Sequence, residues 1–247
     1  MYNLKGKTAL VTGGSRGIGR EFALALAESG ADVVVNYAGN DEKALEVKSM
    51  IEEKGRKCTL AKVDLSMPDC AEELYKYVHN VDILVLNASV QYRNKWQNIT
   101  LDEFETQINC NLRSALLLIQ KFSPYMVNNK WGRIVTIGSV QEAKPHPDML
   151  VYSASKVALT LMAKSLALQL ANSGVTVNSI APGVILTDRN TEALKDENYY
   201  KVVLSKIPVG FCGNANECVG ALMLLCSEEG KYITGQNIFV DGGMGIM

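Results

Sequence analysis

Residues 8–19 read TALVTGGSRGIG, and this stretch of the chain decides the fold. A short apolar run, typical of a buried strand, passes directly into glycines and then into a segment with helical periodicity. Gly13 permits a tight turn, Gly17 lets the backbone approach a phosphate group, and Gly19 lets the helix pack closely against the sheet. The order of strand, glycine-rich loop and helix predicts a dinucleotide site, with the pyrophosphate at the helix N-terminus.

The same alternation of strand and helix continues to the end of the chain. Strands are expected at 8–12, 32–36, 58–63, 82–86, 133–137, 175–180 and 237–240. Helices are expected at 18–29, 42–53, 70–79, 101–127, 151–172 and 215–227. Three of these helices should end at Gly30, Gly55 and Gly174. Most strand segments are continuously apolar, which is typical of parallel strands covered on both faces. Residues 1–247 are therefore predicted to form a single doubly wound Rossmann-type α/β domain, with a central parallel sheet of about seven strands.

The composition excludes several classes of protein. The chain is 47% hydrophobic and 21% charged, as in ordinary globular proteins, and its net charge of -1 gives no attraction for nucleic acid or an anionic membrane. The start of the chain lacks the apolar segment of a signal peptide, and no apolar run is long enough to span a bilayer. The six cysteines form no C-x-x-C pair and the chain has two histidines, so no metal site is expected. We therefore predict a cytoplasmic protein whose cysteines are small buried groups.

Further motifs follow the glycine loop in a fixed order. They are Asp64-Leu65 after the third strand, Asn87-Ala88-Ser89 after the fourth, Asn111 in a helix, Ser139 after the fifth strand, Tyr152-Ser153-Ala154-Ser155-Lys156, and the stretch from Pro182 to Thr187. With these motifs the chain resembles the short-chain dehydrogenase/reductases nearly from end to end. Among them it is most similar overall to the 3-oxoacyl-[acyl-carrier-protein] reductases. Ser89 departs from the family pattern, which has a glycine at that place.

The resemblance implies an oxidoreductase that uses a nicotinamide cofactor. The catalytic residues carried over from the family motifs are Asn111, Ser139, Tyr152 and Lys156. The cofactor-binding residues are Gly13, Ser15, Arg16, Ile18, Gly19, Asn36, Asp64, Leu65, Asn87, Ala88, Tyr152, Lys156, Ile185 and Thr187. A substrate loop is expected at about residues 187–213. A homotetramer is also expected, because the segments 101–127 and 151–172 carry more apolar residues than one sheet-facing stripe requires.

The residue types fit the interconversion of a ketone and a secondary alcohol, in which hydride reaches carbon and a proton reaches oxygen. Lys156 lies one helical turn beyond Tyr152, where its ammonium would favour the phenolate that proton transfer requires. Ser139, at the C-terminal end of a strand, would donate a hydrogen bond to the substrate oxygen. The resemblance implies that Lys156 also holds the nicotinamide ribose, and that Asn111 carries a proton relay through water. Taken singly, each of these residues has a simpler interpretation as a surface or turn residue.

The end of the second strand bears on the choice of cofactor. An NAD-specific site has a carboxylate there to bind the ribose 2′-hydroxyl, but this strand ends Asn36-Tyr37-Ala38. Arg16 in the glycine loop can reach a 2′-phosphate, and Asn36 can hydrogen-bond to it. NADP(H) is therefore favoured over NAD(H), with a solvated loop cation as the alternative interpretation of Arg16.

The loops around the expected site point to a small polar substrate. Carrier-protein reductases typically present basic side chains at the ends of the two long helices, but residues 128–130 and 172–174 supply one cation here. The loop 141–148 is bulky and charged where those enzymes have a small, glycine-rich loop. Polar and charged side chains expected on the same rim are Gln91, Arg93, Lys95 and Arg189. His146, between two prolines, is expected to contact substrate at most.

These features favour a sugar acid, a polyol or a hydroxysteroid as substrate. The charges have a simpler interpretation as solvated loop residues, so a 3-oxoacyl-thioester reductase stays open as the alternative function. A non-catalytic dinucleotide-sensing protein is the alternative from another class.

Overall fold

Seven strands form one parallel sheet in the computed structural model, which describes residues 2–191 and 193–247. In chain order the strands are β1 (Thr8–Val11), β2 (Asp32–Tyr37), β3 (Cys58–Lys62), β4 (Ile83–Leu86), β5 (Gly132–Ile137), β6 (Val175–Pro182) and β9 (Asn237–Val240). Across the sheet they lie in the order β3-β2-β1-β4-β5-β6-β9, and each neighbouring pair is parallel. This is the order of a doubly wound sheet, whose winding reverses between β1 and β4. The predicted Rossmann-type α/β fold is confirmed, as is the number of strands.

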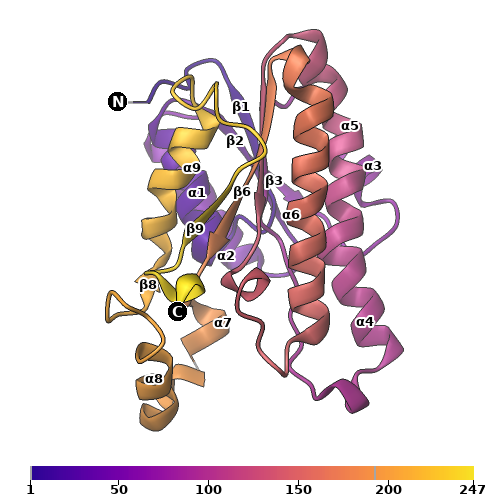
Figure 1. Cartoon of the computed structure of the whole chain (residues 1–247). Coiled ribbons are helices and arrows are strands. Elements are labelled where there is room, and N and C mark those ends of the chain that lie inside the picture. The colour runs from indigo at the N-terminus through magenta and orange to yellow at the C-terminus, as the bar shows by residue number, and fades with distance from the viewer. Residues whose placement is uncertain (1, 192) are drawn as a thin grey trace.

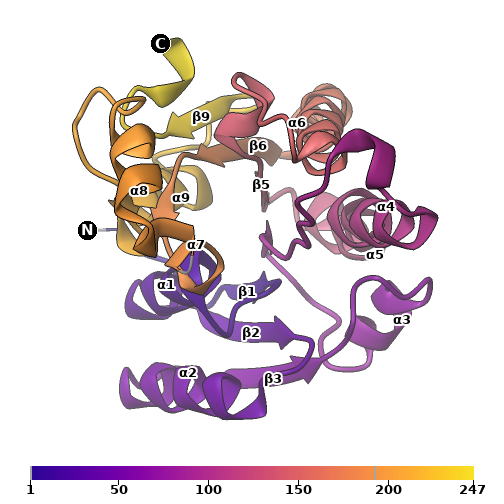
Figure 2. The same ribbon diagram turned by 90° about the horizontal axis from the view of Figure 1, so that it is seen from below.

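Helices cover both faces of the sheet (Figure 2). One face carries α1 (Gly17–Glu28), α2 (Asp41–Glu53) and α9 (Val219–Cys226). The other face carries α3 (Cys70–Tyr75), α4 (Leu101–Ile108), α5 (Ser114–Asn128) and α6 (Leu150–Leu170). Alternate strand residues point to opposite faces, so Val11 and Val33 join one apolar cluster while Leu10 and Val34 join the other. Because both faces are buried, the strands read as unbroken apolar runs.

The helix expected at 101–127 is interrupted near its middle. A π-helical turn, Asn109–Arg113, separates α4 from α5. The Asn111 side chain in this turn bonds to the backbone of Val90, accepting from its N–H at 2.8 Å and donating to its carbonyl at 2.9 Å. Such turns often occur at functional sites, because the extra residue redirects a side chain. The apolar periodicity continues through the turn, so it did not predict the break.

Other boundaries differ from the expected ones by a few residues. Helix α3 ends at Tyr75 instead of residue 79, and the last helix begins with a 3₁₀ turn, Ala215–Cys218, before α9. Gly30, Gly55 and Gly174 have φ angles of 102°, 73° and 75°, as expected of glycines that end helices. The remaining short helices are Trp96–Asn98, Val140–Glu142, Ala171–Ser173, Ala193–Lys195 and Met244–Ile246.

The predicted substrate loop has secondary structure of its own. Strands β7 (Ile185–Leu186) and β8 (Gly213–Asn214) pair in parallel at its two ends. Between them lie α7 (Asp188–Thr191) and α8 (Glu197–Leu204), beyond the lower end of the sheet in Figure 1. Since β6 runs into this segment at Pro182, the segment lies at the C-terminal ends of the strands, where open parallel sheets bind ligands.

Candidate active site

A cavity of about 820 Å³ opens at the C-terminal ends of the strands. It is lined by every residue that the sequence analysis assigned to the cofactor: Gly13, Ser15, Arg16, Ile18, Gly19, Asn36, Asp64, Leu65, Asn87, Ala88, Tyr152, Lys156, Ile185 and Thr187. Ser139 also lines it. The structure therefore brings three of the four expected catalytic side chains and the glycine loop into one cleft of a size that suits a ligand.

The glycine loop forms a cradle that side chains would fill. Gly13 and Gly17 have φ angles of 61° and 54°, a region that favours glycine. A Cβ atom on Gly13 would lie 3.0 Å from Cα of Ala88, and a Cβ on Gly17 would lie 3.3 Å from Cγ2 of Thr187. The first turn of α1 has no side-chain cap from its N-cap residue, Arg16. A bound pyrophosphate would supply acceptors for these N–H groups, so the loop fits a dinucleotide.

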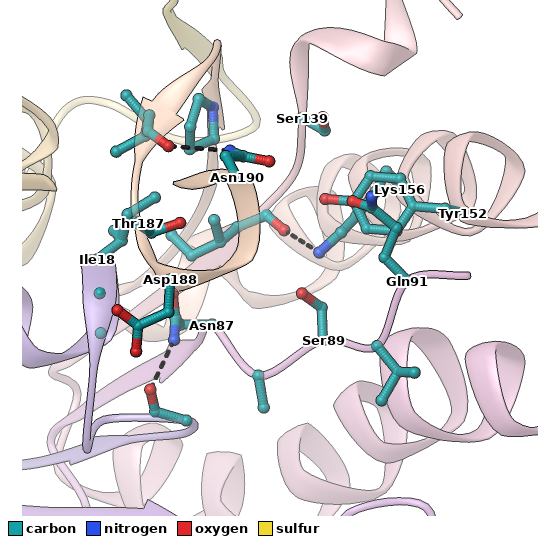
Figure 3. A pocket seen from close by; sticks show the side chains of 18 of the residues that line it. Ile18, Asn87, Ser89, Gln91, Ser139, Tyr152, Lys156, Thr187, Asp188 and Asn190 are labelled. Carbon is teal, nitrogen blue, oxygen red and sulfur yellow. Dashed lines mark hydrogen bonds between the residues drawn. The ribbon is translucent and has the colours of Figure 1, made fainter. Parts of the chain in front are cut away.

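Hydrogen bonds tie the loop after β1 to the loop after β4. The Thr12 hydroxyl accepts from the backbone N–H groups of Asn87 at 2.9 Å and Ala88 at 3.0 Å. In return, Asn87 Nδ2 donates to the carbonyl oxygens of Thr12 at 2.9 Å and Gly13 at 3.1 Å, and one dashed line from Asn87 is drawn in Figure 3. Two segments more than 70 residues apart in sequence thereby form one floor for the cleft.

Asn36 lines the cleft, and its side chain has hydrogen-bond partners within the protein. Its Nδ2 donates to the carbonyls of Ala61 at 3.2 Å and Val63 at 2.9 Å, and its Oδ1 accepts from the Gly13 N–H at 3.4 Å. Both amide hydrogens are thus used within the protein, and the residue is buried. Asn36 thus holds the glycine loop against β3, and its expected hydrogen bond to a 2′-phosphate stays a prediction. Arg16 is exposed at the mouth of the cleft.

Tyr152 and Lys156 lie one turn apart on α6 and face the cleft together (Figure 3). Lys156 is 1% exposed, and its Nζ donates to the carbonyl of Ile137 at 2.7 Å. The same Nζ lies 5.5 Å from the centroid of the Tyr152 ring. A buried cation close to a phenol stabilises the phenolate, which suits the pair to proton transfer.

Ser139 is held at the end of β5 by Glu142, a residue that the sequence analysis did not single out. The Ser139 N–H donates to Glu142 Oε1 at 2.9 Å, and the Ser139 hydroxyl accepts from the Gln141 N–H at 3.2 Å. Asn237 Nδ2 donates to Glu142 Oε2 at 3.0 Å. Burial raises the pKa of the Glu142 carboxyl, while these hydrogen bonds and the nearby charge of Lys156 act against the rise. The spacing of Ser139 and Glu142 is that of a capping box, a sequence signal that would have found this contact.

Asn111 lies behind the cleft. Besides its bonds to Val90, its Nδ2 donates to the hydroxyl of Ser155 at 3.1 Å, and that hydroxyl donates to the carbonyl of Tyr152 at 2.7 Å. Asn111 thus fixes the first turns of α6 relative to the loop after β4. Its role in a proton relay stays a prediction.

The substrate end of the cleft is walled by three segments: residues 89–93 after β4, residues 139–149 after β5, and residues 194–206 around α8. Polar side chains on this wall are Gln91, Arg93, Gln141, His146 and Lys206. Apolar ones are Val90, Val140, Met149, Leu194, Tyr199, Val202 and Val203, and Met244 lines the same cavity from outside these segments. Lys95 is exposed outside this lining, and the side chain of Arg189 lies outside the described part of the structure.

The described residues were also compared with what a metal site and a membrane-spanning helix require. Within residues 2–191 and 193–247, no three His, Cys, Asp or Glu side chains gather as they would around a metal ion. In the same part of the chain, no helix has the length and apolar character needed to cross a bilayer. All six cysteines are buried, as predicted.

Comparison with known proteins identifies the family. Over residues 7–198 the sequence matches the short chain dehydrogenase family. It is 39% identical over 242 residues to the 3-oxoacyl-[acyl-carrier-protein] reductase FabG of Staphylococcus aureus, covering 96% of this chain and 98% of that protein. It is 34% identical over 250 residues to 3beta-hydroxysteroid dehydrogenase 1 of Eggerthella lenta, covering 99% of this chain and 96% of that protein.

A solved relative matches equally well in three dimensions. The gluconate 5-dehydrogenase of Burkholderia cenocepacia, in complex with NADP and tartrate, superposes with a TM-score of 0.91 and 30% sequence identity, covering 99% of this chain and 97% of that one. This chain belongs to the short chain dehydrogenase family and is an oxidoreductase of that family. The resemblance to 3-oxoacyl-[acyl-carrier-protein] reductases is confirmed.

Proposed function

We propose that this protein interconverts a ketone and a secondary alcohol on a small polar substrate of the sugar-acid, polyol or hydroxysteroid type. The observation that carries this proposal is the wall at the substrate end of the cleft, where Arg93, His146 and Lys206 stand beside two glutamines. Such groups favour hydroxyl and acid functions, because an acyl chain would leave them desolvated without a partner. Val140, Val202 and the other apolar side chains of the wall suit the carbon skeleton.

The relatives support both this proposal and its alternative. The Burkholderia relative is a gluconate 5-dehydrogenase and the Eggerthella relative a 3beta-hydroxysteroid dehydrogenase, which agree with a polar or steroid substrate. The Staphylococcus relative is a 3-oxoacyl-[acyl-carrier-protein] reductase, which agrees with the alternative, a 3-oxoacyl-thioester reductase. The polar wall favours the first group.

In the proposed mechanism of reduction, the nicotinamide supplies hydride to the carbonyl carbon when it is bound. Tyr152 donates its phenolic proton to the carbonyl oxygen, and the ammonium of Lys156 stabilises the phenolate that remains. Ser139 donates its hydroxyl hydrogen to the same oxygen as negative charge develops there. Its Oγ already accepts from Gln141, which fixes the direction of the hydroxyl. Asn111 is proposed to hold the water through which a proton reaches Lys156 from solvent, and oxidation follows these steps in reverse.

NADP(H) is proposed as the cofactor in preference to NAD(H). The described residues that line the cleft at the end of β2 are Asn36, Tyr37, Ala38, Gly39 and Asn40, none of which is a carboxylate. Asp41, the first residue of α2, is engaged by Lys62 at 2.8 Å and by the Tyr37 hydroxyl at 2.9 Å. Arg16 stands at the mouth, where a 2′-phosphate would gain a charged partner.

We also propose that the chain is a single domain, located in the cytoplasm, that assembles into a homotetramer. Three leucines of one helical layer are largely exposed. Leu101 on α4 is 71% exposed, and Leu161 and Leu168 on α6 are 63% and 85% exposed. Covering these side chains between subunits would remove apolar area from water. Sedimentation at micromolar concentration should give the mass of four chains, and a monomer mass would contradict the assembly.

A substrate screen with NADPH and NADH tests the function. The screen compares kcat/KM for keto-sugar acids, oxosteroids and 3-oxoacyl thioesters, and for polyols with the oxidised cofactor. The absorbance of the reduced nicotinamide gives the rate of each reaction. We expect a polar or steroid substrate to give the highest value. If thioesters win by orders of magnitude, the alternative function is correct. If the protein binds NADPH but turns over none of these classes, the non-catalytic interpretation is favoured.

A further inference from the structure

Three cationic or ionisable side chains converge on the substrate end of the cleft, one from each of the segments that wall it. Arg93 comes from the segment after β4, His146 from the segment after β5, and Lys206 from the turn that follows α8. All three line the same cavity as Tyr152. The sequence analysis expected Arg93 on this rim and His146 near the substrate, and the structure adds Lys206, which reaches the cavity from a distant segment of the chain.

No carboxylate among the described lining residues balances these charges. The lining contains Asp64 and Asp188. Asp64 accepts from the N–H and the hydroxyl of Ser66, both at 2.8 Å, and Asp188 pairs with Lys43 at 2.5 Å. Within the described residues, neither Arg93 nor Lys206 forms an ion pair. Among the described lining residues, the substrate end thus has two cations and no carboxylate, and Asp148, outside the lining, is the acidic group whose charge acts on His146.

His146 is held so that it presents a hydrogen-bond donor. Its Nδ1 accepts from the Asp148 N–H at 3.1 Å, so the neutral ring carries its hydrogen on Nε2. The backbone N–H of His146 donates to Gln141 Oε1 at 2.6 Å. Burial lowers the pKa of His146, the charges of Arg93 and Lys206 lower it further, and Asp148 opposes them. The two cations thus lie within electrostatic range of a neutral imidazole.

We propose that Arg93, His146 and Lys206 form an anion subsite that binds a carboxylate group of the substrate. The inference rests on the proposed ketone–alcohol reaction and narrows its substrate class from polar molecules in general to hydroxy and keto acids. Two cations and a neutral N–H donor match the charge and the acceptor oxygens of a carboxylate. An uncharged polyol or steroid would leave the cations uncompensated, so the acid should be preferred.

Matched pairs of substrates test the subsite. D-gluconate is compared with D-sorbitol, and cholate with its methyl ester, by kcat/KM with the oxidised cofactor and by calorimetric binding to the protein loaded with NADP. For at least one pair, we expect kcat/KM for the acid to be about tenfold or more above that for its uncharged partner. This ratio should decrease as the salt concentration rises. D-sorbitol 6-phosphate serves as a further arm. A kcat/KM for D-sorbitol 6-phosphate above the values for both acids would overturn the assignment of the subsite to a carboxylate.

Substitutions connect the preference to these residues. Arg93→Gln and Lys206→Gln should each lower kcat/KM for the acid by roughly 5- to 20-fold, as expected for charged hydrogen bonds weakened by solvent exposure. The uncharged partner should change less than about twofold, because it makes no charged contact. Lys201→Gln, on the exposed side of α8, and Lys95→Gln are matched controls that remove a nearby cation outside the cleft lining.

The outcomes separate the subsite from the proposed function. Turnover in which acids have no advantage, or equal losses in the Lys206→Gln and Lys201→Gln variants, would overturn the subsite and leave the reaction standing. Absence of turnover for all pairs would count against the proposed reaction, and the calorimetric comparison of acid with uncharged partner would then decide the subsite alone.

Discussion

Gly19→Ala is a strong test of how the dinucleotide cradle is built. A Cβ atom at this position overlaps the carbonyl oxygen of Gly13 and lies 2.5 Å from Nδ2 of Asn87. Relieving an overlap with backbone costs about 1–3 kcal/mol. Displacing Asn87 weakens its two bonds to Thr12 and Gly13, at roughly 0.5–1.5 kcal/mol each. The higher helix propensity of alanine returns at most about 1 kcal/mol. The net expectation is a loss of about 2–4 kcal/mol in the free energy of unfolding.

Thermal and urea denaturation measure this loss, and titration with NADPH measures its effect on the cradle. For a chain of this length the midpoint should fall by roughly 5–15 °C, and NADPH affinity should fall with it. Gly220→Ala is the matched control, since Gly220 lies on α9 with no atom within 4 Å of the added Cβ. That variant should be unchanged or stabilised by up to about 1 kcal/mol. A Gly19→Ala protein with the wild-type midpoint and NADPH affinity would refute the reasoning.

Three further predictions concern the chemistry and the charges of the cleft. Tyr152→Phe should nearly abolish turnover and keep NADPH affinity, because it removes only the hydroxyl; normal turnover with cofactor bound would contradict the mechanism. Arg16→Ala should weaken NADPH binding by about 1–3 kcal/mol and leave NADH binding unchanged, and equal losses for both would contradict a 2′-phosphate contact. Folding lowers the pKa of His146 below its usual value of 6.5. As the pH falls through about 6.5, the unfolded chain therefore binds a proton before the folded chain does, and the free energy of unfolding decreases. In urea denaturation, His146→Gln should reduce this decrease of the free energy of unfolding with pH. The control variant His79→Gln, at an exposed histidine, should leave it unchanged.

The sequence predicted most of the fold because its signals are local. Mostly apolar runs marked the seven strands, and Gly30, Gly55 and Gly174 marked helix ends through the positive φ that glycine tolerates. The family motifs likewise brought Tyr152 and Lys156 onto one face of a helix that could be recognised from its periodicity.

Interactions between distant segments account for what the sequence did not predict. The bonds from the Asn36 amide to Ala61 and Val63 were not predicted, because these residues reach it only when β3 pairs with β2. The π turn at Asn111 depends on the backbone of Val90, and periodicity carries no information about that partner. Lys206 reaches the cleft only because α8 folds over the end of the sheet.

The hydrogen bond from Lys156 to the Ile137 carbonyl has a consequence for how this fold diversifies. It fastens α6, which carries Tyr152, to β5 two residues before Ser139, so it helps to fix the spacing of the two side chains that we propose contact the substrate oxygen. Two segments of the wall, residues 89–93 and 194–206, take no part in this bond or in the bonds that hold Ser139. We therefore expect mutations in these two segments to change the wall without disturbing the spacing of Ser139 and Tyr152. One arrangement of Ser139, Tyr152 and Lys156 would then suit different substrates, and the two wall segments would decide which of them binds.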